Sequence, residues 1–209
     1  AEHDELASAI LVTTSETLAN KVSEQVEVVN NNAMDQSGLK AEAMIVNYDG
    51  KVIYQTSADL DSKEDTTTPV YGLAFDSPEL SDVYYIKLRL TQGDRLIADN
   101  FYCLGKEEGN LQQLHSLPQV KVDADTAVKK SGDRWEAKVQ LKNNADVPAL
   151  MIRLKVYGKK TGERILPAFY SDNYISLLPG EEKEVTITFK DEDTRGERPA
   201  VAISGFNIK

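Results

Sequence analysis

The most regular feature of the chain is an alternation of apolar and polar positions with a period of two. In the second half, Trp135, Ala137, Val139 and Leu141 alternate with polar residues. Successive side chains of a strand point to opposite faces, so this pattern predicts half-buried strands. Further strands are predicted at 24–30, 39–48, 51–57, 69–75, 83–91, 95–104, 120–122, 149–157, 185–189 and 200–208.

Turn residues separate these segments. Asp49-Gly50 stands between two strand-like runs and predicts a two-residue hairpin turn with a positive φ at both positions. Pro179-Gly180 fits the central pair of a type II turn, in which Pro sets φ and Gly supplies a positive φ. The pattern over residues 5–23 leaves the local structure open, and a strand followed by a short helix is one interpretation.

The charge distribution divides the chain into two parts. Residues 1–105 carry 18 acidic and 7 basic side chains, a net charge of −11, whereas residues 106–209 carry 16 acidic and 17 basic ones, a net charge of +1. The junction over residues 105–118 is polar, contains Gly105 and Gly109 and ends at Pro118, as in a short connector. Each part shows about seven short strands. The sequence therefore predicts an all-β protein of two tandem immunoglobulin-like β-sandwiches, over 1–109 and 110–209.

Composition excludes several classes of function. The total charge of −10 argues against nucleic acid and against anionic membrane surfaces. No apolar run approaches the roughly 20 residues that span a bilayer. With Cys103 as the single cysteine and His3 and His115 as the only histidines, we expect no disulfide within the chain, no metal site and no cofactor. The chain begins with Ala and shows no leader, so we expect a mature chain or an excised piece.

Catalytic and calcium-binding motifs are also missing. The sequence contains no G-x-S-x-G elbow, glycine-rich phosphate loop, H-E-x-x-H or C-x-x-C motif. Residues 191–196 begin like a calcium loop, but Arg195 stands where a ligand belongs and Ala202 replaces the closing Glu. We expect a solvated turn there.

One segment is more specific. Residues 164–189 contain Leu166-Pro167, Ser171-Asp172-Asn173-Tyr174 and Leu178-Pro179-Gly180-Glu181, followed by an alternating strand. This segment closely resembles the C-terminal immunoglobulin-like domain of glycoside hydrolase family 2 enzymes, in the branch of β-mannosidases and exo-β-glucosaminidases. Residues 84–104, 114–122 and 201–207 are similar to neighbouring parts of those enzymes, whereas the resemblance over 1–80 is weak. Cys103 departs from the pattern, which leads us to expect a tryptophan there.

The resemblance implies a role without catalysis. Family members carry two catalytic glutamates on a (β/α)₈ barrel, which takes roughly 250 residues of alternating strands and helices. This chain shows no such alternation. The resemblance therefore implies a non-catalytic C-terminal accessory region whose partners are the catalytic barrel and the N-terminal domains of the same parent chain, in a periplasmic or secreted bacterial enzyme. The alternatives are an independent carbohydrate-binding module, with oligosaccharide as the partner, and a surface protein-interaction domain.

The candidate site lies in the same segment. Phe169, Tyr170, Asp172, Asn173 and Tyr174 combine aromatic rings with short polar side chains, which suits contacts to the C–H groups and hydroxyls of a sugar. In the parent enzyme these residues would line the rim of the substrate pocket. The alternative is a structural turn, since Asp and Asn side chains bond to nearby backbone N–H groups. Packing is the expected role of Trp135.

Overall fold

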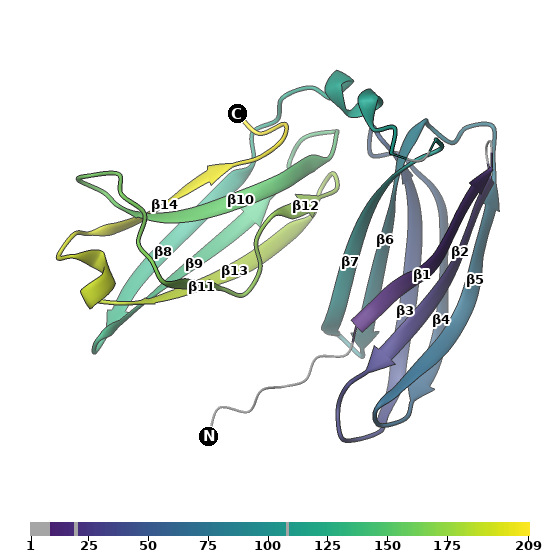
Figure 1. Ribbon diagram of the computed structural model, residues 1–209, viewed down its shortest axis with the longest axis horizontal. Helices are drawn as coiled ribbons and strands as arrows, with labels where there is room; N and C mark the ends of the chain where they lie inside the picture. Colours follow the sequence, from purple (N-terminus) through teal and green to yellow (C-terminus); the bar gives the residue numbers. More distant parts are fainter. Residues whose placement is uncertain (1–8, 19–20, 108) are drawn as a thin grey trace. The chain divides into compact units, whose positions relative to one another are not determined.

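The structure is a computed structural model that describes residues 9–18, 21–107 and 109–209. It forms two compact units, a first that ends at Ser116 and a second over Leu117–Lys209. Both are built from antiparallel strands (Figure 1). The prediction of two tandem, all-β immunoglobulin-like sandwiches is confirmed.

The first unit contains seven strands in its described part. They form a three-stranded sheet of order β1-β2-β5 and a four-stranded sheet of order β4-β3-β6-β7. The strands are β1 (Ala9–Leu18), β2 (Lys21–Asn30), β3 (Gln36–Asn47), β4 (Val52–Ser62), β5 (Thr66–Asp76), β6 (Val83–Gln92) and β7 (Arg95–Gly105). Between the sheets lie buried side chains such as Ile10, Val26, Ile45, Leu73 and Leu88.

The second unit repeats this plan. A four-stranded sheet of order β11-β13-β9-β8 faces a three-stranded sheet of order β12-β10-β14. The strands are β8 (Asp123–Ser131), β9 (Arg134–Lys142), β10 (Ala149–Gly158), β11 (Ala168–Tyr170), β12 (Ile175–Leu177), β13 (Glu182–Lys190) and β14 (Pro199–Ser204), with the 3₁₀ helix η2 (Glu192–Thr194) between the last two.

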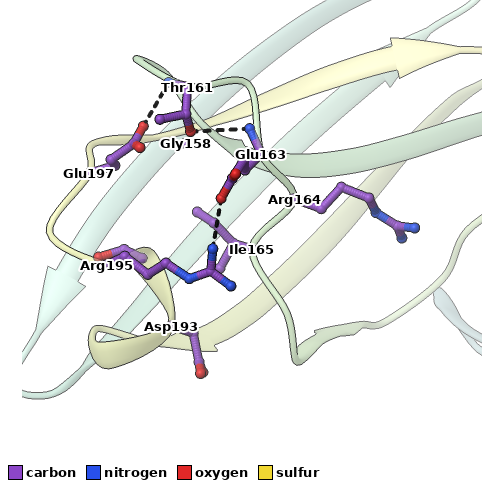
Figure 2. A pocket seen from close by; sticks show the side chains of 9 residues that line it. Gly158, Thr161, Glu163, Arg164, Ile165, Asp193, Arg195 and Glu197 are labelled. Carbon is purple, nitrogen blue, oxygen red and sulfur yellow. Dashed lines mark hydrogen bonds and ion pairs between the residues drawn. The ribbon is translucent and has the colours of Figure 1, made fainter.

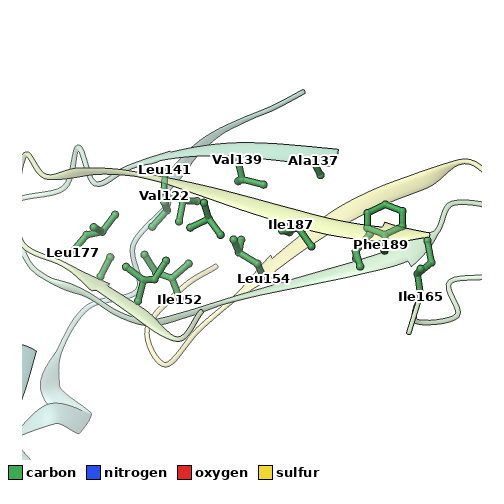
Figure 3. Packing of buried hydrophobic residues seen from close by; sticks show 14 of the residues in the cluster. Val122, Ala137, Val139, Leu141, Ile152, Leu154, Ile165, Leu177, Ile187 and Phe189 are labelled. Atoms are coloured by element: carbon green, nitrogen blue, oxygen red, sulfur yellow. The ribbon is translucent and has the colours of Figure 1, made fainter. Parts of the chain in front are cut away.

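The core of the second unit follows the predicted alternation. Ala137, Val139 and Leu141 of β9 point inward, and Ile152 and Leu154 of β10 approach them from the other sheet (Figure 3). All five are at most 1 % exposed. Burial of a Val, Leu or Ile side chain contributes about 1.5–3 kcal/mol, so this double layer supplies most of the driving force for folding of the unit.

Three expectations about strands are corrected. Residues 9–18 form a strand, so the short helix does not occur in the part of 5–23 that the structure describes. Val120 forms only an isolated bridge to Ile208, and the strand begins at Asp123. The last strand ends at Ser204 instead of residue 208, because the chain then turns and the side chain of Asn207 bonds to the backbone at Pro118, Pro148 and Leu150.

The hairpin turn at Asp49-Gly50 also differs from the prediction. The hairpin between β3 and β4 is present, but Asn47 accepts a hydrogen bond from the Gly50 N–H at 2.9 Å and donates one to Lys51 O at 2.9 Å. Of the two predicted turn residues, only Gly50 has a positive φ, +95°. The loop therefore has three residues, with a turn closed by a left-handed glycine, instead of a two-residue type I′ turn. The type II turn at Pro179-Gly180 is confirmed by a Gly180 φ of +80° and a Glu181 N–H to Leu178 O bond of 3.1 Å.

The connector belongs to the first unit. The predicted boundary lies after residue 109, whereas the two units divide between Ser116 and Leu117. The 3₁₀ helix η1 (Gln112–Ser116) is held to β6 because the Val83 N–H donates to Gln113 Oε1 at 2.7 Å.

Candidate functional site

Strand β10 lacks a continuous strand neighbour along one edge. Its partner β12 pairs with it only at Ala149 and Ile152. At the next position along this edge, the Leu154 N–H donates to Asn173 Oδ1 at 2.8 Å, and Asn173 Nδ2 donates to Leu154 O at 3.1 Å. The carboxamide of Asn173 thus replaces a strand residue by filling both hydrogen-bonding positions of Leu154.

The hydroxyl of Tyr170 continues this pairing one step further. The Val156 N–H donates to Tyr170 Oη at 3.2 Å, and the Ile165 N–H donates to Val156 O at 3.2 Å. Because unpaired backbone groups in a buried strand cost free energy, these side chains have a clear structural task.

The remaining polar groups of the loop are also engaged. Asp172 Oδ1 accepts the Asn173 N–H at 2.7 Å, and Asp172 Oδ2 lies 2.6 Å from Lys183 Nζ. Asn173 Oδ1 accepts a further bond from the Tyr174 N–H at 3.0 Å. Three of the five predicted rim residues, Tyr170, Asp172 and Asn173, therefore bond within the unit.

The two other predicted residues are exposed, on different faces. Phe169 is 68 % exposed and lies opposite Thr188 of β13, on the outer side of the four-stranded sheet. Tyr174 is 55 % exposed and precedes β12 in the other sheet, with the guanidinium carbon of Arg153 6.0 Å from its ring centroid. The structure places the five residues in β11 and the loop that follows it, but it does not gather their rings into one aromatic platform.

A polar hollow lies between the β10–β11 loop and the β13–β14 connection (Figure 2). Glu163 Oε2 pairs with Arg195 Nη1 at 2.7 Å, and Glu197 Oε2 accepts the N–H groups of Lys160 and Thr161, each at 3.0 Å. The side-chain bond to Thr161 and these backbone bonds lower the pKa of Glu197. Both glutamates therefore act as structural acceptors within the unit.

Trp135 closes the same end of the sandwich. Its ring packs against the core, and its Nε1–H donates to Asp191 Oδ1 at 2.8 Å. Lys130 Nζ lies 2.7 Å from Asp191 Oδ2, and the hydrogen bonds from Lys130 and Trp135 lower the pKa of Asp191. Both carboxylate oxygens of Asp191, the first residue of the apparent calcium loop, are therefore bonded to side chains of the same unit.

The described residues contain neither a cluster of metal ligands nor a membrane-spanning helix. Across 9–18, 21–107 and 109–209, no three His, Cys, Asp or Glu side chains are grouped to hold a metal ion. In the same ranges, no helix has the length and apolar character of a membrane span.

Two further residues of this region, Met151 and Arg153, were not predicted from the sequence and lie on the outer face of β10, with Arg153 over the ring of Tyr174. A signal was present, because Met151 is an apolar residue at an outward position of an otherwise alternating strand.

Family models match both units. Residues 100–208 match the exo-β-D-glucosaminidase Ig-fold domain, and residues 15–106 match the mannosidase Ig/CBM-like domain.

Similar proteins were found among curated proteins and solved structures. An exo-β-D-glucosaminidase of Streptomyces avermitilis is 31 % identical, in a match that covers 87 % of this chain and 23 % of that protein. One from Arthroderma benhamiae is 25 % identical over 89 % of this chain and 22 % of its own length. The crystal structure of the Amycolatopsis orientalis exo-chitosanase CsxA superposes with a TM-score of 0.85 at 26 % identity, over 95 % of this chain and 26 % of that one.

The chain is thus a pair of immunoglobulin-like sandwiches of the kind found in glycoside hydrolase family 2. It belongs to the exo-β-D-glucosaminidase Ig-fold domain family, whose model covers more than half of it. It spans about a quarter of the length of the relatives that it matches.

Proposed function

We propose that this chain is the non-catalytic C-terminal accessory region of a larger glycoside hydrolase that resembles exo-β-D-glucosaminidases. In this role it stabilises the enzyme or borders the active site of a barrel that lies outside these residues. The observation that carries the proposal is that both units match immunoglobulin-like domains of such enzymes, in the same order, over about a quarter of their length.

The chemistry of the second unit supports this assignment. Glycosidases use two carboxyl groups on either side of the scissile bond, one of them able to give up a proton. In the polar hollow, Glu163 is paired with Arg195 and Glu197 is held by backbone N–H groups. These bonds leave both acids in structural roles.

The proposal is tested first by the reading frame around the gene, which should encode a (β/α)₈ barrel upstream of these residues. The encoded polypeptide should hydrolyse 4-nitrophenyl β-D-glucosaminide, and the 209-residue chain should not. Hydrolysis by the purified chain alone, or a reading frame without a barrel, overturns the proposal.

An independent carbohydrate-binding module is the second candidate, favoured by the exposed rings of Phe169 and Tyr174. Stacking of a sugar on either ring would give a heat of binding in calorimetric titrations with manno- and gluco-oligosaccharides. Phe169→Ala and Tyr174→Ala are the matched variants, one for each face. Absence of binding heat with both sugar series rules this candidate out.

A further inference from the structure

The outer face of the sheet β12-β10-β14 differs from a solvated sheet surface. Four of its side chains are the outward residues of β10, Met151, Arg153, Lys155 and Tyr157, and two come from neighbouring segments, Tyr174 and Phe206. We call these six residues the β10 face. The positions of β14 opposite Arg153, Lys155 and Tyr157 are small, Ser204, Ala202 and Ala200. A partner can therefore approach the longer side chains of β10 without obstruction from the neighbouring strand.

Strained backbone presents two of the apolar side chains. Met151 and Tyr174 have φ values of +55° and +59°, in the left-handed region that non-glycine residues rarely adopt. Such a conformation costs on the order of 1–3 kcal/mol. Met151 lies where the register between β10 and β12 shifts, and a bulge of this kind redirects a side chain. The result is a Met151 side chain 52 % exposed and a Tyr174 side chain 55 % exposed.

Phe206 joins them at the same end of the face. Its N–H donates to Leu150 O at 2.9 Å, directly before Met151 in the chain. Gly205 permits this close approach, because a Cβ there would lie 2.9 Å from Leu150 O. Phe206 remains 44 % exposed. Three large side chains with exposed fractions of 44–55 % thus stand on adjoining segments of this sheet, an arrangement typical of an interaction surface.

The centre of the face is cationic and lacks carboxylates. Arg153 and Lys155 lie over the rings of Tyr174 and Tyr157, at 6.0 and 5.6 Å, and neither pairs with an acidic side chain in the described part of the chain. On the other sheet, by contrast, Lys142 pairs across strands with Glu182 at 2.6 Å. On the outer face of β9 and β13, Lys138 and Lys142 are thus paired with glutamates, whereas Arg153 and Lys155 have no acidic partner among the described residues.

We propose that the β10 face docks onto an acidic surface of another domain in the same, longer polypeptide, with an apolar recess for Met151 and Phe206. This inference rests on the proposed function, which places further domains beside this chain. Met, Tyr, Phe and Arg are the residues enriched in interface cores. Carboxylates are required opposite Arg153 and Lys155, and like charges oppose pairing of the face with a second copy of itself. Relatives carry about three quarters of their length outside the matched region, which supplies such a surface.

Lysine reactivity tests the docking directly. Acetylation rates of Lys155 and of the exposed control Lys129 on β8 are measured by mass spectrometry, in the 209-residue chain and in the full-length polypeptide. We expect Lys155 to react at least tenfold more slowly in the full-length protein, whereas the rate of Lys129 changes less than twofold. A carbodiimide should cross-link Lys155 to an Asp or Glu outside residues 1–209.

Charge reversal supplies the matched variants. Arg153→Glu, which leaves the Lys155 amine in place, should weaken the Lys155 cross-link at least tenfold and expose Met151 to peroxide oxidation in the full-length protein, whereas Lys129→Glu should change neither. Both substitutions lie on the surface, and the Tm of the 209-residue chain verifies that the variants fold.

Four results overturn the docking. Equal acetylation of Lys155 in both proteins shows that the β10 face is not docked. If the full-length enzyme is nevertheless active, the proposed function stands. Protection that grows with protein concentration assigns the face to a second copy, and protection of the isolated chain by polygalacturonate assigns it to an anionic polysaccharide. A reading frame without further domains removes the docking and the proposed function together.

Discussion

Replacement of Asn173 by Ala distinguishes a structural role of the loop between β11 and β12 from a role in sugar contact. The substitution removes both hydrogen bonds that pair the backbone of Leu154, the 2.8 Å bond from its N–H and the 3.1 Å bond to its carbonyl. It also removes Asn173 Oδ1 as the acceptor of the Tyr174 N–H.

The magnitude follows from the burial of Leu154. This residue is 1 % exposed, so water cannot fully replace the lost partner. A hydrogen bond contributes about 0.5–1.5 kcal/mol net, and an orphaned buried group costs about 1–3 kcal/mol. We therefore expect Asn173→Ala to lower the free energy of unfolding of the second unit by about 2–3 kcal/mol. That is a large part of the roughly 5–15 kcal/mol that stabilises a typical domain.

Unfolding of the second unit can be followed by tryptophan fluorescence. Trp135 is its single tryptophan and lies in the second unit, so its fluorescence reports the unfolding of that unit. In urea, where m is about 1–3 kcal/mol per M, the midpoint should fall by about 1–2 M.

Asn144→Ala is the matched control, because Asn144 is exposed and bonds only to Asp123 Oδ2. It should move the midpoint little. A loss below about 0.5 kcal/mol for Asn173→Ala would refute the reasoning, since Leu154 would then not depend on this side chain.

Three further predictions concern single side chains. Asn207→Ala removes three hydrogen bonds, one accepted and two donated, that join three separate segments. Because Asn207 is 1 % exposed, the free energy of unfolding of the second unit should fall by about 3–5 kcal/mol in the same fluorescence assay. A loss under about 1 kcal/mol contradicts this expectation. Bonds from Lys130 and Trp135 hold the pKa of Asp191 below its ordinary 3.8, so the stabilisation is complete above that pH and is lost as the pH falls through the lower, folded-state value. A pH titration of Trp135 emission should show a midpoint below pH 3.8 that disappears in Asp191→Asn, and a midpoint at pH 4 or above would contradict the bond. Burial raises the pKa of Cys103 to about 11 from 9.0, so at pH 8 its thiol should react with DTNB about a hundredfold more slowly than an exposed thiol; reaction at the rate of free cysteine would show that the thiol is exposed.

Much of the fold could be predicted because it depends on a local pattern. Strands with one buried face, such as β9 and β10, are visible in the alternation itself. Strand β8 is not, because Val128 is the only half-buried side chain in a strand that is otherwise exposed. Its place at the edge of the sheet comes from backbone pairing with β9, which leaves no apolar pattern to read.

The turn at Asp49-Gly50 shows a second limit. A dipeptide indicates that the chain reverses, but the length of the loop depends on where the strands bond. The register of β3 and β4 shifts between Ile45 and Val46, so the loop needs one more residue than the two-residue turn provides. Such a shift is a property of the strand pair.

The candidate site could be predicted only in part, because its hydrogen-bond partners are distant in the sequence. Asp172 and Asn173 were correctly recognised as residues that bond to backbone, but the partner of Asn173 is Leu154, 19 residues earlier, and no local rule names it. Tyr174 gives no sign in the sequence that it will adopt a positive φ. The sequence gives no sign of the positive φ of Met151 either, but Met151 is a large apolar residue at an outward position of β10, where Arg153 and Lys155 are polar. A break in an otherwise regular pattern is thus the signal that leads from the sequence to the β10 face, and the strained backbone at Met151 is its structural counterpart.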